Sequence, residues 1–242
     1  MAVNAGSCHA RERYEPFLLA LGASYNDGYQ TLGANTCFEK GIFGYTTSNV
    51  RRGELEDLMR RKMNISEAKC VGKHPRILIQ DRHERRMLNS DKLKIALEAK
   101  LSATVSSIYF EDIPLHEQLQ AVYCADVLVG VQGAGLEHYR FLRPGASVLE
   151  VGWKHWPAGR YKRRANSLGY RADVIDNCDA ILTEHSWSRY FEHNEPLRDK
   201  SKDEILKLVN KVSFGLDKNI WKFADCELNI QQALKKIKHL LR

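Results

Sequence analysis

The sequence predicts an α/β protein with a doubly wound parallel sheet, and three observations support this fold class. Apolar runs at 76–80, 127–131 and 147–151 have the length of buried strands, and stretches with helical spacing alternate with them. The runs are almost continuously hydrophobic, which is typical of a sheet that helices cover on both faces. Strands that alternate with helices also favour parallel pairing.

Each expected element has a signal of its own. Ser90 is a candidate N-cap for the first helix, and Pro114 suits the first turn of the second. β-Branched and aromatic residues mark the second strand. In chain order we expect a strand at 76–80, a helix at 91–101, a strand at 104–110, a helix at 114–124, a strand at 127–131, a helix ending at 142 and a strand at 147–151.

The rest of the chain has weaker patterns. Outside the sheet we expect a helix at 53–63, irregular chain from about 176 to 198, and amphipathic helices at 201–212 and 229–241. We therefore predict two parts. Residues 1–72 form a partial N-terminal lobe or leader, and residues 73–242 form the lobe that holds the sheet and the C-terminal helices.

Composition excludes several classes of protein. The chain has 242 residues, 43% of them hydrophobic and 28% charged, which is unlike disordered or collagen-like proteins. No apolar run approaches the roughly 18 residues of a membrane span, and we see no targeting segment or membrane anchor. Six cysteines occur without a C-x-x-C pair, which argues against a zinc ribbon and a redox dithiol. Their even number permits disulfides without implying them.

The segment that follows the first strand is a candidate anion site. Residues 81–89 contain three arginines, whose planar guanidinium groups suit phosphate oxygens. The alternative is a solvated turn in which Asp81 and Glu84 neutralise the arginines.

A glycine-rich turn follows the strand at 127–131. Gly133 and Gly135 would let the backbone approach a ligand, and free N–H groups at a helix start favour an anion. The spacing is neither the dinucleotide motif G-x-G-x-x-G nor a Walker loop. A tight turn that needs glycine for backbone reasons alone is the alternative.

The third candidate stretch is 150–156, which leads into a basic cluster. Residues 153–171 contain six cations and no acid, so Trp153 and Trp156 could stack on a ring while the cations meet phosphates. The alternative is that these aromatic side chains cover the core. We do not expect nucleic-acid binding, because no recognition motif accompanies the charge. All three stretches should lie along one edge of the sheet, beyond the carboxyl ends of its strands.

Together these segments resemble glycosyltransferase family 61. In chain order they are Cys37-Phe38-Glu39-Lys40, the run from Ile77 to Asn89, the pair Glu117-Gln118, residues 125–136, and Phe141-Leu142-Arg143-Pro144-Gly145 before Val148-Leu149-Glu150. Their order and spacing are fairly specific. The resemblance covers about Cys37 to Val174.

The resemblance implies a Rossmann-like C-terminal lobe of a GT-B glycosyltransferase. It further implies inverting transfer of a sugar, N-acetylglucosamine or xylose, from a UDP-sugar to a protein or glycan hydroxyl in the endoplasmic reticulum or Golgi lumen. No other cofactor is expected, and no Asp-x-Asp or His-x-x-x-His pair supports a metal. The implied donor-site residues are Arg82, Arg86, Asn89, Gln132, Gly133, Ala134, Gly135 and Glu150.

Two departures from the family pattern leave alternatives open. Gln132 stands where the family usually has a histidine before Gly-Ala-Gly, and glutamine cannot act as an acid or base. The N-terminal lobe is also mostly missing. Position alone makes Asp81, His83 and Glu84 candidates for the base, so the catalytic residue is unassigned. A catalytically inactive module that binds a nucleotide sugar, or acts as a scaffold, is therefore the second hypothesis.

Overall fold

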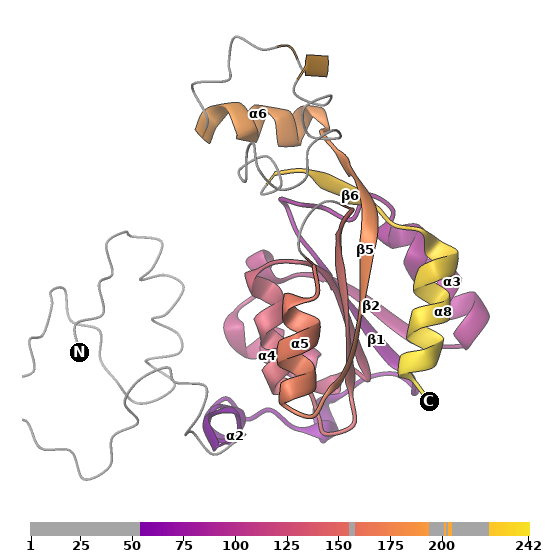
Figure 1. Cartoon of the computed structure of the whole chain (residues 1–242). Coiled ribbons are helices and arrows are strands. Elements are labelled where there is room, and N and C mark those ends of the chain that lie inside the picture. Colours follow the sequence, from indigo (N-terminus) through magenta and orange to yellow (C-terminus); the bar gives the residue numbers. More distant parts are fainter. Residues whose placement is uncertain (1–53, 155–157, 194–200, 202, 205–222) are drawn as a thin grey trace, which may run out of the picture. The chain divides into compact units, whose positions relative to one another are not determined.

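The computed structural model describes residues 54–154, 158–193, 201, 203–204 and 223–242 (Figure 1). The chain divides into two compact units, Met1–Ile65 and Ser66–Arg242. Of the first unit only helix α2 (Glu54–Lys62) and the turn after it are described, and this helix confirms the one expected at 53–63. The two parts proposed for 1–72 and 73–242 stay a prediction. All that follows concerns the second unit.

A six-stranded, mostly parallel sheet forms the centre of the second unit. The strand order is β2-β1-β3-β4-β5-β6, and only the β5–β6 pair is antiparallel. The α/β class with a parallel sheet is thereby confirmed. The strands are β1 (Arg76–Asp81), β2 (Thr104–Tyr109), β3 (Val127–Val131), β4 (Ser147–Trp153), β5 (Arg171–Ile181) and β6 (Asp225–Glu227).

Helices cover both faces of the sheet. In Figure 1, α3 and α8 lie on one face, and α4 and α5 lie on the other. The α-helices are α3 (Ser90–Leu101), α4 (Leu115–Cys124), α5 (Arg160–Ser167), α6 (Glu184–His193) and α8 (Ile230–Leu240). Short 3₁₀ helices are η1 (Glu67–Lys69), η2 (Phe110–Asp112) and η3 (Ala134–Phe141). Helix α8 confirms the helix expected at 229–241.

The central strands are buried along their whole length. Every residue of β1, β3 and β4 is buried, as the continuous apolar runs indicate. The buried polar residues Gln80 and Asp81 end β1, and the buried Glu150 lies at the middle of β4, in register with Gly130 near the carboxyl end of β3. These ends therefore combine a rigid framework with polar groups.

The helix expected to end at 142 is present as the 3₁₀ helix η3. One expectation about secondary structure is wrong. The chain after 176 is not irregular, because it continues β5 and then forms α6. Strand β5 is mostly exposed or half-buried and contains several acids, so it lacks the apolar run of the central strands. Most of the helix expected at 201–212 lies outside the described residues.

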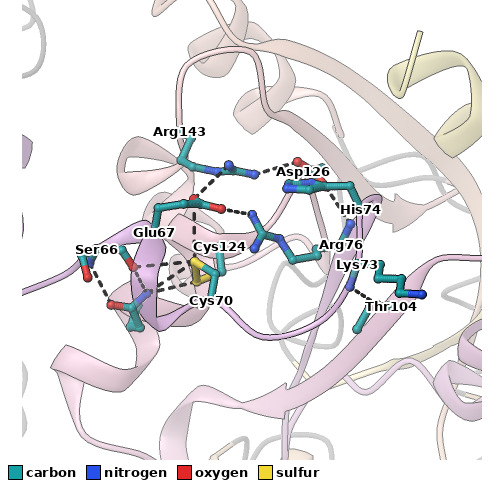
Figure 2. A network of polar contacts seen from close by, with 11 residues as sticks. Ser66, Glu67, Cys70, Lys73, His74, Arg76, Thr104, Cys124, Asp126 and Arg143 are labelled. Carbon is teal, nitrogen blue, oxygen red and sulfur yellow. Dashed lines mark hydrogen bonds and ion pairs between the residues drawn. A yellow bond between two sulfur atoms is a disulfide. The ribbon is translucent and has the colours of Figure 1, made fainter.

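A network of ion pairs fastens the amino ends of the strands (Figure 2). The Asp126 carboxylate accepts from the Arg76 N–H at 2.7 Å and from Arg143 Nη2 at 2.7 Å, and it contacts His74 Nδ1 at 2.6 Å. Glu67 bridges the guanidinium groups of Arg76 and Arg143. Its hydrogen bond to Arg76 lowers the pKa of Glu67. The network lies at the edge of the sheet opposite the carboxyl ends of the strands.

Two disulfides join distant segments of the described chain. Cys70–Cys124 links the segment before β1 to α4, as Figure 2 shows, and Cys178–Cys226 links β5 to β6. The second bridge lies in the core beside Trp153 and Tyr190. The first bridge ties the segment before β1 to the end of α4, and the second joins two strands that also pair through their backbones.

Candidate functional site

The strand order creates a topological switch point between β1 and β3. From β1 the chain moves outward to β2, then returns to the other side of β1 and continues outward through β3, β4 and β5. The loops after β1 and β3 therefore diverge, and in open α/β sheets ligands bind in the crevice at such a point. These loops carry the arginines and the glycine-rich turn that the sequence singles out.

The structure places Arg82 directly on Gly133. The Arg82 guanidinium occupies the space that a Cβ on residue 133 would need, and Arg85 Nη2 would lie 3.2 Å from that Cβ. The backbone of Gly133 is extended, with φ 172°, so glycine is required here for space and not for an unusual dihedral. The first and second candidate stretches thus meet, as expected.

Arg85 is the second guanidinium at the turn. Its Nη1 donates to the Gln132 carbonyl at 3.0 Å, and it forms no ion pair with any residue in the described part of the chain. Burial, and then the neighbouring Arg82, lower the pKa of Arg85 to about 10. Arg85 also has a left-handed backbone, with φ 57°. Such conformations cost about 1–3 kcal/mol in non-glycine residues and cluster at functional sites.

The acids near this turn are engaged elsewhere. Glu84 Oε1 accepts from Arg189 Nε at 3.0 Å and Nη2 at 2.8 Å, which ties the loop to α6. Asp81 is buried and accepts from the Ser107 hydroxyl, and burial raises the pKa of Asp81. Neither acid therefore forms an ion pair with Arg85, as the solvated-turn alternative would require of this arginine.

Arg86 is bound by Asp225 and Thr183. Its Nη2 donates to Asp225 Oδ2 at 2.8 Å and to Thr183 Oγ1 at 2.9 Å, and its backbone N–H donates to Asp225 Oδ1 at 2.8 Å. The hydrogen bond to Asp225 raises the pKa of Arg86. Sequence reasoning selected Arg86 and left out Arg85, and no signal in the sequence separates these neighbouring arginines.

Asn89 anchors the same loop to the segment after β6. Its Nδ2 donates to the Leu228 carbonyl at 2.8 Å, and its Oδ1 accepts from the Leu228 N–H at 3.0 Å. The Cys226 N–H donates to the Arg86 carbonyl at 2.8 Å, and the Leu88 N–H donates to the Cys226 carbonyl at 2.9 Å. The loop that carries the arginines is therefore held by the C-terminal part of the chain.

The floor of the turn is formed by Gln80. Its carboxamide fills the space that a Cβ on Gly135 would need, and Oε1 lies 3.0 Å from the Cβ position of Gly130. Gln80 is 2% exposed, and its Oε1 has no hydrogen-bond partner within the described ranges. Ala134 is exposed on the outer side of this turn. The two glycines are thus required because the Gln80 side chain packs closely under the turn.

Glu150 lies at the middle of β4 and is fully buried. Its Oε2 accepts from the N–H groups of Tyr161 and Lys162, each at 3.0 Å, at the start of α5. Its Oε1 is buried without a hydrogen-bond partner among the described residues. Burial is the largest influence and raises the pKa of Glu150. Glu150 therefore fixes α5 and keeps one acceptor oxygen unused.

The third candidate stretch contains two tryptophans, and the structure describes only the first of them. Trp153 is 1% exposed and donates from Nε1 to the Asp225 carbonyl, so it belongs to the core. Trp156 lies outside the described residues. Two cations of the basic cluster are neutralised, because Lys162 pairs with Asp173 and Arg164 pairs with Glu137. This pairing weakens the basis for a nucleic-acid surface.

The residues with a described structure offer no metal site of the usual kind. They contain no cluster of three or more His, Cys, Asp or Glu side chains suited to a metal ion. They also contain no helix whose length and apolar character would let it cross a membrane.

The fold and the turn define an α/β protein with two arginines on a glycine-rich bend at its switch point. Residues 36–149 match the family model described as Glycosyltransferase 61. The match confirms, over these residues, the resemblance to glycosyltransferase family 61 that the motifs indicate.

Curated relatives agree with this family. The chain is 37% identical over 97 residues to the EGF domain-specific O-linked N-acetylglucosamine transferase of Drosophila melanogaster, which covers 40% of this chain and 18% of that protein. It is 30% identical over 137 residues to the protein of the same name from Xenopus laevis, covering 56% and 25%. The chain thus spans a quarter or less of the length of these relatives.

Proposed function

We propose that the described unit is the donor-binding lobe of a GT-B glycosyltransferase and binds the diphosphate of a UDP-sugar. The protein would transfer N-acetylglucosamine or xylose, with inversion, to a hydroxyl of a protein or glycan. The printed name of the relatives favours N-acetylglucosamine and an EGF-domain acceptor.

One observation carries this proposal: Arg82 and Arg85 lie together on the Gly133 turn, and Arg85 has no carboxylate partner in the described chain. Two like charges held close in a half-buried site repel each other, and an anion between them relieves the repulsion. A diphosphate matches the forked geometry of two guanidinium groups. The start of η3 adds backbone N–H groups to the same corner.

The same groups account for the chemistry that this lobe contributes. Negative charge develops on the departing UDP, and fixed donors in a partly dry site stabilise it by about 3–4 kcal/mol for each well-placed group. The arginines supply fixed positive charge, so the transfer is proposed to need no metal ion. The unused Glu150 Oε1 is a candidate acceptor for a hydroxyl of the donor.

The two disulfides bear on the cellular compartment in which the protein works. Stable disulfides form in oxidising compartments such as the lumen of the endoplasmic reticulum. Together with the family, they favour work in the endoplasmic reticulum or Golgi lumen.

Calorimetric titration with UDP tests the proposal. We expect wild-type protein to bind UDP, and Arg85→Ala to weaken binding about 10- to 100-fold, because a charged hydrogen bond contributes about 1.5–3 kcal/mol. Arg163→Ala is the matched control, since this exposed arginine of α5 lies outside the turn. Absence of UDP binding, or equal losses in both variants, would contradict the proposal.

The inactive module remains the second candidate, because Gln132 replaces the usual histidine. In the structure the Gln132 carbonyl holds Arg85, a contact that any residue could make with its main chain. The active enzyme and the inactive module differ in whether the protein turns over a UDP-sugar. Release of UDP from UDP-N-acetylglucosamine, unchanged by a chelator, supports the metal-independent enzyme, whereas binding without release supports the module.

A further inference from the structure

We propose that His83 is the general base of the transfer and that Asp112 orients it. This inference rests on the proposed function, and it assigns a role that the sequence left open among Asp81, His83 and Glu84. His83 directly follows Arg82 in the loop after β1, at the carboxyl edge of the sheet, and so belongs to the same loop as the proposed diphosphate ligands.

His83 and Asp112 form a carboxylate–imidazole pair. His83 Nε2 lies 2.7 Å from Asp112 Oδ1. A carboxylate can only accept, so Nε2 carries the proton and Nδ1 holds the lone pair. No residue in the described ranges hydrogen-bonds to Nδ1. The pair thus presents an unoccupied basic nitrogen of fixed tautomer, as general-base catalysis requires.

Tyr109 fixes the plane of the imidazole. The two rings stack with centroids 4.7 Å apart and an interplanar angle of 15°. Tyr109 ends β2 and Asp112 ends η2, so both partners of His83 come from one short segment. The side chains of His83 and Asp112 are 56% and 55% exposed, which leaves the pair open to an acceptor.

The other candidates are less suited to this role. Glu84 is held by Arg189 through two hydrogen bonds, and Asp81 is buried against Ser107. His138 lies on η3, where Nδ1 is 2.9 Å from the Gly135 carbonyl and Phe110 covers the ring. Burial lowers the pKa of His138 to about 4, so it is a weak base.

In the proposed step the acceptor attacks the anomeric carbon as UDP leaves. The acceptor hydroxyl oxygen forms a bond to the anomeric carbon of the sugar while Nδ1 of His83 takes the hydroxyl proton. The bond between the anomeric carbon and the diphosphate oxygen breaks, and its electron pair leaves with UDP. The imidazolium then gives its proton to solvent, and the sugar has the inverted configuration.

Two acids of η2, Asp112 and Glu111, raise the proton affinity of His83. Tyr109 of β2 stacks on the ring, and Arg82 and Glu84 are the neighbours of His83 in its own loop. The hydrogen bond to Asp112 is the largest cause and raises the pKa of His83. Because the base acts only when deprotonated, turnover should fall as pH decreases through this raised pKa.

Steady-state release of UDP from UDP-N-acetylglucosamine between pH 5 and 9 tests the inference, with UDP affinity measured in parallel on the full chain. For His83→Asn we expect kcat to fall about 10²- to 10⁴-fold with loss of the acidic limb of the profile. UDP affinity should stay within about twofold. For Asp112→Asn the acidic limb of the pH profile should move to lower pH, because Asp112 is the group that raises the pKa of His83. His116→Asn is the matched control, because His116 is also exposed beside an acid, Glu117, but lies on α4.

Chemical rescue separates catalysis from a structural role. Added imidazole should restore part of the turnover of His83→Gly and leave wild type unchanged. The inference is overturned if His83→Asn stays within threefold of wild type, if it keeps the acidic limb, if imidazole restores nothing, or if wild type binds UDP yet releases none at any pH. Failure of wild type to bind UDP would instead overturn the proposed function.

Discussion

The Arg86 guanidinium and the Asp225 carboxylate form an ion pair between two segments that are 139 residues apart. Asp225 is fully buried, and both of its oxygens accept from Arg86. The Thr183 hydroxyl donates to the same carboxylate at 2.8 Å. This pair explains how a loop with three arginines keeps a defined course: one arginine anchors it, and the other two reach the glycine turn.

Removal of the Asp225 carboxylate should destabilise the fold. We expect Asp225→Ala to lower the free energy of unfolding by about 3–5 kcal/mol, because it leaves the charge of Arg86 half-buried and unpaired. Urea unfolding measures the loss. Asp179→Asn, an exposed residue of the neighbouring strand β5, should change stability by less than about 0.5 kcal/mol. A loss below about 1 kcal/mol in Asp225→Ala would show that the pair is not an anchor.

A methyl group at position 133 should displace Arg82. The extended backbone of Gly133 accepts alanine, so Gly133→Ala should fold, but its Cβ would collide with the Arg82 guanidinium. The guanidinium is the end of a flexible side chain and can move. We therefore expect weaker UDP binding with a thermal midpoint within a few degrees of wild type. Unchanged UDP affinity in calorimetry would argue against a functional contact between the turn and Arg82.

The Cys70–Cys124 disulfide should contribute to stability. It closes a loop with a sequence separation of 54, for which the chain-entropy estimate is about 4 kcal/mol. Cys70→Ser/Cys124→Ser should lose stability of that order in urea unfolding. Mass spectrometry of unreduced peptides should recover this bridge and Cys178–Cys226. Recovery of both Cys70 and Cys124 as free thiols from oxidised protein would contradict the structure.

Glu150 should make stability depend on pH. Burial raises the pKa of Glu150 in the folded state, so the folded protein holds a proton that the unfolded chain releases at lower pH. The contribution of Glu150 to stability therefore falls as pH rises from the unfolded value, about 4.3, through the folded value. Glu150→Gln keeps an oxygen to cap α5, so its stability relative to wild type should increase from pH 4.5 to 7. A constant difference over this range in urea unfolding would refute the effect.

The central sheet was predictable because its strands are buried on both faces. Ile77 to Ile79 and Val127 to Val131 are buried apolar runs, and such runs have few alternatives to a parallel sheet. Strand β5 was not predictable along its whole length, because exposed residues such as Asp176 interrupt its apolar pattern. The short outer strand β6 pairs with β5 only at Asp179, Ala180 and Ile181, so much of β5 stays exposed or half-buried and its sequence carries a weak signal.

The location of the candidate site could be predicted from the sequence, but the contacts of its side chains could not. Loops after parallel strands must meet at one edge, so Arg82 and Gly133 could be brought together from sequence. The choice between Arg85 and Arg86 depends on the left-handed backbone of Arg85 and on Asp225, a partner far along the chain. Neither follows from local spacing.

A crystal structure of the protein with UDP tests the central claim most directly. The account predicts that the diphosphate lies between the guanidinium groups of Arg82 and Arg85 and the backbone of the Gly133 turn, while Arg86 stays paired with Asp225. A diphosphate bound elsewhere on the molecule, or held by an Arg86 released from Asp225, would contradict it.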